Sequence, residues 1–219
     1  AVGKVEINMH SIPLSYLTFS AHKMHGPMGI GALYIRDHHS LKPMLCGGKQ
    51  EHGLRPGTEN VLGIVGFGAA ASERKRDLHV LIEKLTLMRD RLERELLETV
   101  SNTIVNGCQT NRVCNTTNLR FDGVDGEALV ALLDRAGIRC SQSSACTSGL
   151  PEPSYVLRAL GLTDEEGHSS IRFSLSNDNS PDEIDIAIEK IQATVAQLRG
   201  LRADLQGEAI VTGEISHEI

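Results

Sequence analysis

Short apolar runs separated by glycine-containing turns dominate the first 75 residues or so. The runs over residues 14–19 and 30–36 have the length of buried strands, and a Gly-Pro pair lies in the turn between them. A helix is predicted over residues 60–76, where glycines and a run of three alanines give a face suited to close packing. The first part of the chain is therefore predicted to combine short strands with one helix.

Apolar side chains then recur at helical spacing over residues 77–100, which predicts a long amphipathic helix with a solvated charged face. We expect this helix to bridge two domains. Its apolar positions are Leu78, Leu81, Ile82, Leu85, Met88, Leu92, Leu96 and Leu97.

In the remainder of the chain, apolar residues alternate between the spacing of strands and the spacing of helices, as expected of a small α/β domain over residues 101–202. The final helix begins at a Ser180-Pro181 pair, with serine as N-cap and proline at the first helical position. After residue 202 the periodicity stops, so residues 203–219 are predicted to be a tail. The predicted strands are residues 103–106, 116–121, 138–140 and 169–175, and the predicted helices are residues 126–136, 154–160 and the segment from 181 onward.

Composition excludes several classes of protein. With 219 residues, 40% hydrophobic and 23% charged, the chain suits one large domain or two small ones, and no internal repeat is visible. The net charge of −6 gives no basic footprint for nucleic acid. No apolar run approaches the roughly 20 residues of a membrane span and no secretory signal opens the chain, so we expect a cytoplasmic protein, or an organellar matrix protein if the source is eukaryotic.

Five cysteines without dense spacing favour a reducing compartment over a disulfide framework. Cys108, Cys114 and Cys140 are expected to pack or to be idle, and nothing near Cys46 marks it as a nucleophile or ligand. No metal site is expected, because the histidines and cysteines lack paired ligand spacing.

Polar groups cluster where the first predicted strand ends. Ser20, His22 and Lys23 follow the apolar run directly and precede the Gly26-Pro27 turn. A lysine there can form a Schiff base with a carbonyl cofactor if its pKa is lowered by burial or a nearby cation, and the hydroxyl and imidazole suit a phosphate. Taken alone, these few residues fit an ordinary surface turn better.

A cysteine lies in a second polar stretch, residues 141–151, whose small side chains are typical of a loop rather than a packed core. Cys146 in such a setting keeps a pKa near about 8.5 unless a neighbour lowers it, so part of it is thiolate at neutral pH. An isolated Ser-Ala-Cys is more often incidental than catalytic.

Four segments in order resemble the cysteine desulfurases, the NifS/IscS-like branch of the fold-type I enzymes that use pyridoxal 5′-phosphate (PLP). Residues 20–31 resemble the family's cofactor-lysine segment, and residues 47–58, Gly-Gly-Lys-Gln-Glu-His-Gly-Leu-Arg-Pro-Gly-Thr, its glycine-rich excursion. Residues 143–149 resemble its cysteine loop, of the longer group I kind, and residues 171–175 its arginine-bearing strand. Two small departures, Ala21 and Ser143 at positions that are commonly glycine, are expected to leave function intact.

The resemblance implies an α/β fold, the PLP-dependent transferase fold-type I of the class-V aminotransferases. Residues 1–76 would be the C-terminal part of the large PLP-binding domain with part of its mixed sheet. Residues 77–100 would form the bridging helix and residues 101–202 the small domain. The chain would then be the C-terminal portion of an enzyme whose N-terminal portion, in a companion polypeptide, completes the cofactor site.

The resemblance also assigns roles. Lys23 would hold PLP, with Ser20 and His22 on its phosphate, and Thr58 would reach the phosphate of the other subunit in a homodimer. Arg172 would bind the carboxylate of L-cysteine. Cys146 would take the substrate sulfur as a persulfide, leaving L-alanine, and pass it to a sulfur-acceptor or scaffold protein for iron–sulfur cluster assembly or another thiolation pathway.

Alternatives stay open at this point. A selenocysteine lyase would share the fold, the lysine and the cysteine, a fold-type I aminotransferase would not need Cys146, and a non-catalytic module could dock sulfur acceptors. Cys140, six residues before Cys146, could exchange sulfur with it, although a buried thiol at a strand end is the simpler interpretation.

Overall fold

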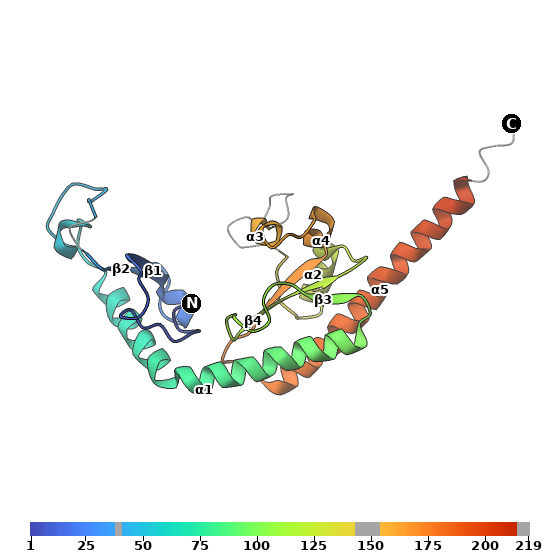
Figure 1. Ribbon diagram of the computed structural model, residues 1–219, viewed down its shortest axis with the longest axis horizontal. Helices are drawn as coiled ribbons and strands as arrows, with labels where there is room; N and C mark the ends of the chain where they lie inside the picture. Colours follow the sequence, from blue (N-terminus) through green and yellow to red (C-terminus); the bar gives the residue numbers. More distant parts are fainter. Residues whose placement is uncertain (38–40, 143–153, 214–219) are drawn as a thin grey trace. The chain divides into compact units, whose positions relative to one another are not determined.

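The computed structural model describes residues 1–37, 41–142 and 154–213, with side chains to residue 204 (Figure 1). The chain divides into two compact units, Ala1–Ile82 and Glu83–Ile219, and helix α1, Val61–Thr99, contributes residues to both. Each unit is described by itself below. The domain limits predicted from the sequence, at residues 76, 100 and 202, stay predictions.

The first unit contains a two-stranded antiparallel sheet. Strand β1 pairs with β2 so that Tyr16 lies opposite Ile35 and Ser20 opposite Gly31. Both predicted strands are therefore confirmed, with ends shifted by a residue or two. The elements before α1 are β1 (Tyr16–Ser20), the 3₁₀ helix η1 (Ala21–Met24), β2 (Gly31–Ile35) and the 3₁₀ helix η3 (Glu51–Gly53).

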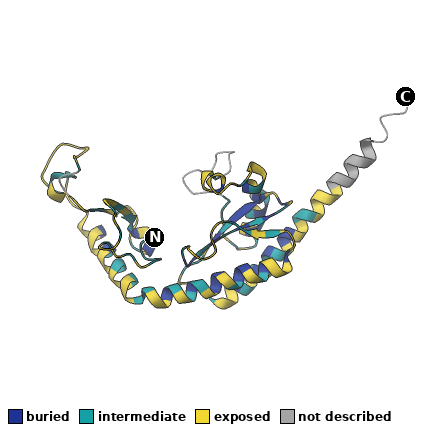
Figure 2. Ribbon diagram, viewed as in Figure 1, coloured by how far each residue is buried: buried dark blue, intermediate teal, exposed yellow. Residues whose placement is uncertain are grey.

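The core of this unit is small. Its buried cluster consists of Ala21, Met24 and Phe67, and the ring of Phe19 packs edge-on against that of Phe67 with centroids 5.6 Å apart. Figure 2 shows most of the unit in the colours of exposed and half-buried residues. A two-stranded sheet over so few buried side chains is marginal in water without further packing. Large apolar side chains left exposed include Met28, Met44, Leu45, Val61, Leu62 and Val65.

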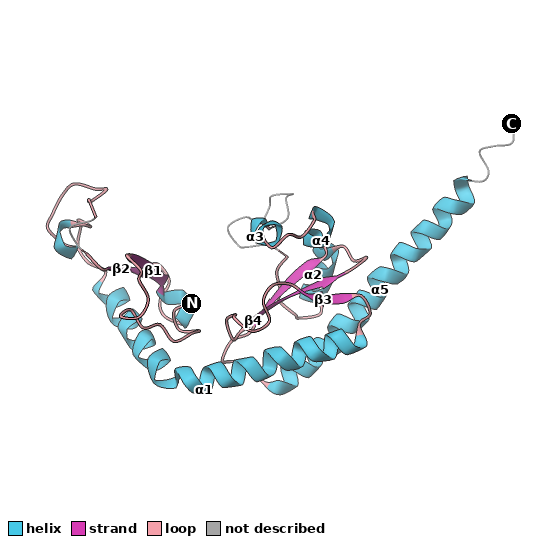
Figure 3. Ribbon diagram, viewed as in Figure 1, coloured by secondary structure: helices cyan, strands magenta, loops and turns pink. Residues whose placement is uncertain are grey.

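Helix α1 runs without interruption for 39 residues, where the sequence predicted two helices meeting at residues 76 and 77 (Figure 3). The apolar face changes there from small residues to leucines, but no proline or left-handed glycine ends the backbone ladder. Arg76 and Asp77 form an exposed ion pair at the change, 2.8 Å between Nε and Oδ1. The predicted helix boundary was therefore wrong, because the pattern shows only a change in the side chains of the buried face and the backbone helix continues.

The second unit is built on a three-stranded antiparallel sheet of order β3-β4-β5. Leu119 pairs with Ile171 in register, and both side chains are fully buried on one face. Asn118 pairs with Arg172 on the opposite face, because side chains alternate along a strand. Helix α2 packs against α5 and β5. The elements are β3 (Thr103–Val105), β4 (Thr116–Phe121), α2 (Gly126–Arg135), α3 (Tyr155–Ala159), α4 (Asp164–His168), β5 (Ser170–Ser174) and α5 (Pro181–Gly213).

The strand expected over residues 138–140 does not form. Gly137 has a φ of +84°, and the amide of Ile138 donates to Leu133 O (2.8 Å), which closes the C-terminus of α2. After α2, the chain returns to the sheet at Ser141, which forms a single bridge with Arg172. The predicted strand is therefore wrong, because its first amide caps helix α2.

Two further helical segments were not expected. Helix α4 begins at a capping box, in which the Glu166 amide donates to Thr163 Oγ1 (3.3 Å) and the Thr163 amide to Glu166 Oε2 (2.8 Å). Helix α5 continues to Gly213, so residues 203–213 are helical although their sequence lacks the apolar periodicity.

Candidate active site

Helix η1 carries the candidate lysine. Ala21 and Met24 are 0% and 3% exposed, and in a 3₁₀ helix residues three apart lie above one another on the same face. His22 and Lys23, between them, are consequently exposed. Within the described part of the chain, the Lys23 amine has no hydrogen bond or ion pair. The fold therefore anchors this turn through its neighbours and leaves the amine accessible.

The turn after Lys23 is held tightly. The Ala21 amide donates to Ile30 O (3.1 Å) and the Gly26 amide to Ala21 O (2.9 Å), while His25 adopts a left-handed φ of 66°. A Cβ on Gly26 would lie 2.9 Å from the Cβ of Ala21. Only glycine fits this close approach, so the Gly-Pro turn fixes the backbone around the lysine.

Thr58 lies on a different segment of the same unit. The segment is folded on itself by Gln50, whose Oε1 accepts from the Gly57 amide (3.3 Å), and by Arg55, whose Nη1 donates to Pro56 O (3.0 Å). Glu51, His52, Gly53 and Gly57 have positive φ values there. Thr58 itself is exposed. The structure thus brings Ser20, His22 and Lys23 into one short stretch and presents Thr58 separately.

Arg172, in the second unit, is half-buried on the polar face of the sheet. Its backbone is paired on both sides, with Asn118 of β4 and with Ser141. No residue that the structure describes bonds its guanidinium. Near it on the same face, Asn106 Nδ2 donates to Asn118 Oδ1 (2.6 Å) and to Ser170 Oγ (2.9 Å), which fixes these polar side chains.

Cys146 and the rest of the cysteine motif, residues 143–149, lie outside the described residues. The residues just before them are placed. Ser141 exchanges backbone hydrogen bonds with Arg172, and Gln142 Nε2 donates to His168 O (2.5 Å). The sequence offered no signal for this contact of Gln142, because a glutamine in a polar stretch is unremarkable by composition.

The other cysteines differ in acidity. Burial, reinforced by the charge of Asp134, raises the pKa of Cys140 to about 11, so its thiol is protonated at neutral pH and is a poor partner for sulfur exchange. Cys108 does not pack: it is exposed, and hydrogen bonds from the Thr110 side chain and the Asn111 amide lower its pKa to about 7. Cys114 is buried, as expected, and Cys46 is exposed.

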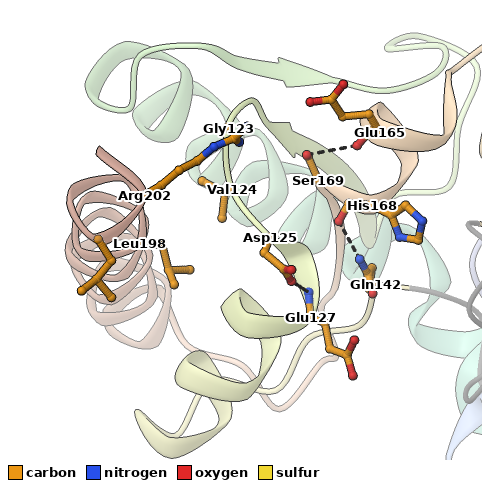
Figure 4. A pocket seen from close by; sticks show the side chains of 11 residues that line it. Gly123, Val124, Asp125, Glu127, Gln142, Glu165, His168, Ser169, Leu198 and Arg202 are labelled. Carbon is orange, nitrogen blue, oxygen red and sulfur yellow. Dashed lines mark hydrogen bonds between the residues drawn. The ribbon is translucent and has the colours of Figure 1, made fainter. Parts of the chain in front are cut away.

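A cavity of about 880 Å³ lies beside Gln142 in the second unit (Figure 4). Figure 4 shows Leu198 and Arg202 of α5 across from His168 and Gln142, with Asp125 at the start of α2 between them. Among described residues no group of three or more histidine, cysteine or acidic side chains could hold a metal ion. None of the helices in the described ranges is long and apolar enough to cross a membrane.

Comparison with known proteins places these features in a family. The aminotransferase class-V family model matches residues 1–186. The chain belongs to this family. A cysteine desulfurase of Trichormus azollae is 47% identical to this chain over 209 residues, 95% of the chain and 52% of the relative. The cysteine desulfurase NifS of Azotobacter vinelandii is 41% identical over 201 residues, 92% of the chain and 50% of the relative.

Solved structures agree. A NifS-like protein superposes with a TM-score of 0.80 at 31% identity, covering 90% of this chain and 51% of that one. A NifS-like protein from Rickettsia africae gives a TM-score of 0.79 at 32% identity over 88% and 51% of the two chains. The expected fold, that of the PLP-dependent fold-type I enzymes, is confirmed. The chain spans about half the length of the curated relatives it matches.

Proposed function

We propose that this chain is the C-terminal part of a PLP-dependent cysteine desulfurase, which converts L-cysteine to L-alanine and leaves the sulfur on Cys146 as a persulfide. The observation that carries the proposal is the Lys23 turn. The chain, a member of the class-V aminotransferase family, holds an accessible amine on a rigid turn, with an imidazole one residue before it and a hydroxyl three residues before it. The names of its relatives favour desulfuration over selenocysteine cleavage or a purely docking role.

The residues present fit the cofactor. The Lys23 amine can form a Schiff base with the aldehyde of PLP, and Ser20, His22 and Thr58 offer hydrogen-bond donors for its phosphate. Thr58 would serve the other subunit of a homodimer. PLP, when bound, supplies an electron sink for the substrate α-carbon.

Substrate binding follows from Arg172. Its guanidinium is half-buried and has no partner among the described side chains, and its planar fork matches a carboxylate with two parallel hydrogen bonds. With PLP bound, the Lys23 amine would carry a proton to and from the α-carbon of the substrate.

Sulfur transfer needs no external oxidant. The Cys146 thiolate attacks the sulfur of L-cysteine, so a new S–S bond forms while the substrate C–S bond breaks and its electron pair stays with carbon. Protonation of that carbon yields L-alanine, and a persulfide remains on Cys146. The sequence separation of five residues between Ser141 and Cys146 allows a Cα separation of at most roughly 18 Å, within reach of the strand that carries Arg172.

The remaining half of the enzyme is a required partner in this proposal. The first unit buries few side chains and exposes several large apolar ones, and the chain matches only half of its relatives. We infer that an N-terminal portion covers this surface and completes the site. A sulfur-acceptor or scaffold protein would then receive the persulfide sulfur in the cytoplasm, for iron–sulfur cluster assembly or another thiolation.

The test uses the complete enzyme loaded with PLP and incubated with L-cysteine. Alanine is measured, and the persulfide is mapped by peptide mass spectrometry. The proposal expects equimolar alanine and a persulfide on Cys146 in a single turnover, with both lost in Lys23→Ala. Cys108→Ser is the matched control and should behave as the wild type. Full alanine production by Cys146→Ser would instead indicate chemistry that does not use the thiol.

A further inference from the structure

We propose that Gln142 is a positioning residue for sulfur transfer: its side-chain amide fixes the start of the Cys146 segment to the main chain at His168, just before the strand that carries Arg172. The inference rests on the proposed function, because it concerns how Cys146 is held relative to the site of the substrate carboxylate. It follows from four described residues, Ser141, Gln142, His168 and Gly126, and from the register of β5.

The central contact is a side-chain hydrogen bond. Gln142 Nε2 donates to His168 O at 2.5 Å, as the dashed line in Figure 4 shows. A carbonyl oxygen can only accept, so the amide nitrogen of Gln142 must face it. The contact joins positions 26 residues apart in sequence, and it therefore ties two segments that chain connectivity alone leaves independent.

Backbone pairing beside this contact sets its register. The Arg172 amide donates to Ser141 O (2.7 Å) and the Ser141 amide to Arg172 O (3.1 Å). Ser141 is thus locked opposite Arg172, and Gln142 adds a third bond one residue closer to Cys146. The side-chain bond of Gln142 therefore adds an attachment next to the isolated bridge at Ser141.

The N-terminus of α2 closes the contact from the other side. A Cβ on Gly126 would lie 2.2 Å from His168 O and 2.8 Å from Gln142 Nε2. Glycine alone leaves room for the amide to reach the carbonyl there. Asp125 fixes this helix end by accepting from the amides of Glu127 (2.9 Å) and Ala128 (3.0 Å). The start of α2, the end of α4 and the residue next to Ser141 therefore meet at one hydrogen bond.

The functional consequence concerns proximity. Only three residues lie between Gln142 and Cys146 along the chain, so the point where the segment is attached limits where the thiol can go. Fixing one end of a short tether raises the effective concentration of a nucleophile at its target. With the tether attached beside Arg172, the thiol is favoured near a substrate whose carboxylate Arg172 holds.

The test compares Gln142→Met, which keeps the length but removes the donor, with Gln192→Met. Gln192 is a matched control, because its Nε2 also donates one hydrogen bond, to Thr99 Oγ1 at 2.6 Å, away from Ser141 and His168. In single turnovers of the complete enzyme with L-cysteine, Gln142→Met should form the Cys146 persulfide about two- to tenfold more slowly, the range for one neutral hydrogen bond. The substrate-dependent change in cofactor absorbance should keep its rate.

Gln142→Lys restores a donor and should recover most of the persulfide rate, whereas Gln192→Met should match the wild type. An unchanged persulfide rate in Gln142→Met, or an equal slowing of the absorbance change, would overturn the positioning role. So would a Gln142→Lys variant as slow as Gln142→Met.

A readout independent of activity separates this inference from the proposed function. Hydrogen–deuterium exchange of the Ser141 and Arg172 amides, in the complete protein, should be about two- to tenfold faster in Gln142→Met than in Gln192→Met. Equal exchange in the two variants would refute the attachment itself. If the two variants show this exchange difference but the wild-type enzyme forms no persulfide, the proposed function and the role in transfer are refuted, and the attachment stands as a structural contact.

Discussion

Gly126→Ala tests the crowding at the start of α2 most sharply. Alanine is ordinarily better than glycine in a helix by about 0.5–1 kcal/mol, so propensity alone predicts a more stable protein. The structure predicts the opposite. The added Cβ would lie 2.2 Å from His168 O, a backbone atom, and 2.8 Å from Gln142 Nε2, so both must shift.

The magnitude follows from three contributions. Overpacking costs about 1–3 kcal/mol, loss of the Gln142 hydrogen bond costs about 1 kcal/mol, and propensity returns up to about 1 kcal/mol. The free energy of unfolding should therefore fall by about 1–3 kcal/mol. Gly200→Ala in α5 is the matched control, since a Cβ there would meet no atom within 4 Å, and it should stabilise by about 0.5–1 kcal/mol.

Urea titration of the complete enzyme, followed by far-ultraviolet circular dichroism, measures both variants. A shift in midpoint at constant slope reports a change in stability. The reasoning is refuted if Gly126→Ala is as stable as Gly200→Ala, because the backbone at His168 would then yield without cost.

Further predictions concern thiol reactivity, a helix cap and the first unit. Iodoacetamide at neutral pH should label Cys108 faster than Cys140, because the thiolate is the nucleophile and the pKa values are about 7 and about 11. Labelling of Cys108 should rise as pH passes 7, and equal rates in peptide mass spectrometry would contradict the pKa assignments. Thr163→Ala removes the α4 cap and should lower the free energy of unfolding by about 1 kcal/mol in urea titration, whereas Thr163→Ser should lose little. Residues 1–82 produced alone should show little amide protection in hydrogen exchange, and a cooperative unfolding transition would show that their small core suffices.

Much of the fold was predictable because local signals agreed with burial. Strand β4 has the predicted bounds, and its alternation of buried and half-buried residues matches the alternation in the sequence. The Pro181 start of α5 is also confirmed. The capping box of α4 was visible as Thr163 and Glu166 three residues apart, but the helix is only five residues long and offers no period to detect.

The errors have two physical causes, competition for the same backbone at the end of α2 and the lack of an apolar period at the end of α5. The Ile138 amide could donate either to a neighbouring strand or to the end of α2. The left-handed φ of Gly137 directs it to a carbonyl of α2. The helical residues 203–213 lack an apolar stripe, so periodicity could not reveal them.

The candidate site also has one part that the sequence could predict and one part that it could not. The resemblance to the cysteine desulfurases marked Lys23 as a candidate, and the structure supplies the reason that it is exposed, because Ala21 and Met24 use the opposite face of η1 for the core. The contact of Gln142 with a main-chain carbonyl depends on the meeting of α2, α4 and β5. Such contacts leave no mark in the sequence, since any polar residue at position 142 has the same local pattern.

The alternation along β5 couples its packing to its chemistry. Ile171 and Phe173 are buried on one face, and Arg172 lies between them on the other. Deleting one residue before this triplet would turn the guanidinium into the apolar layer and an aliphatic side chain toward the polar face. Evolution can therefore exchange side chains in this strand one at a time, but a single-codon deletion would abolish the core and the proposed carboxylate site together.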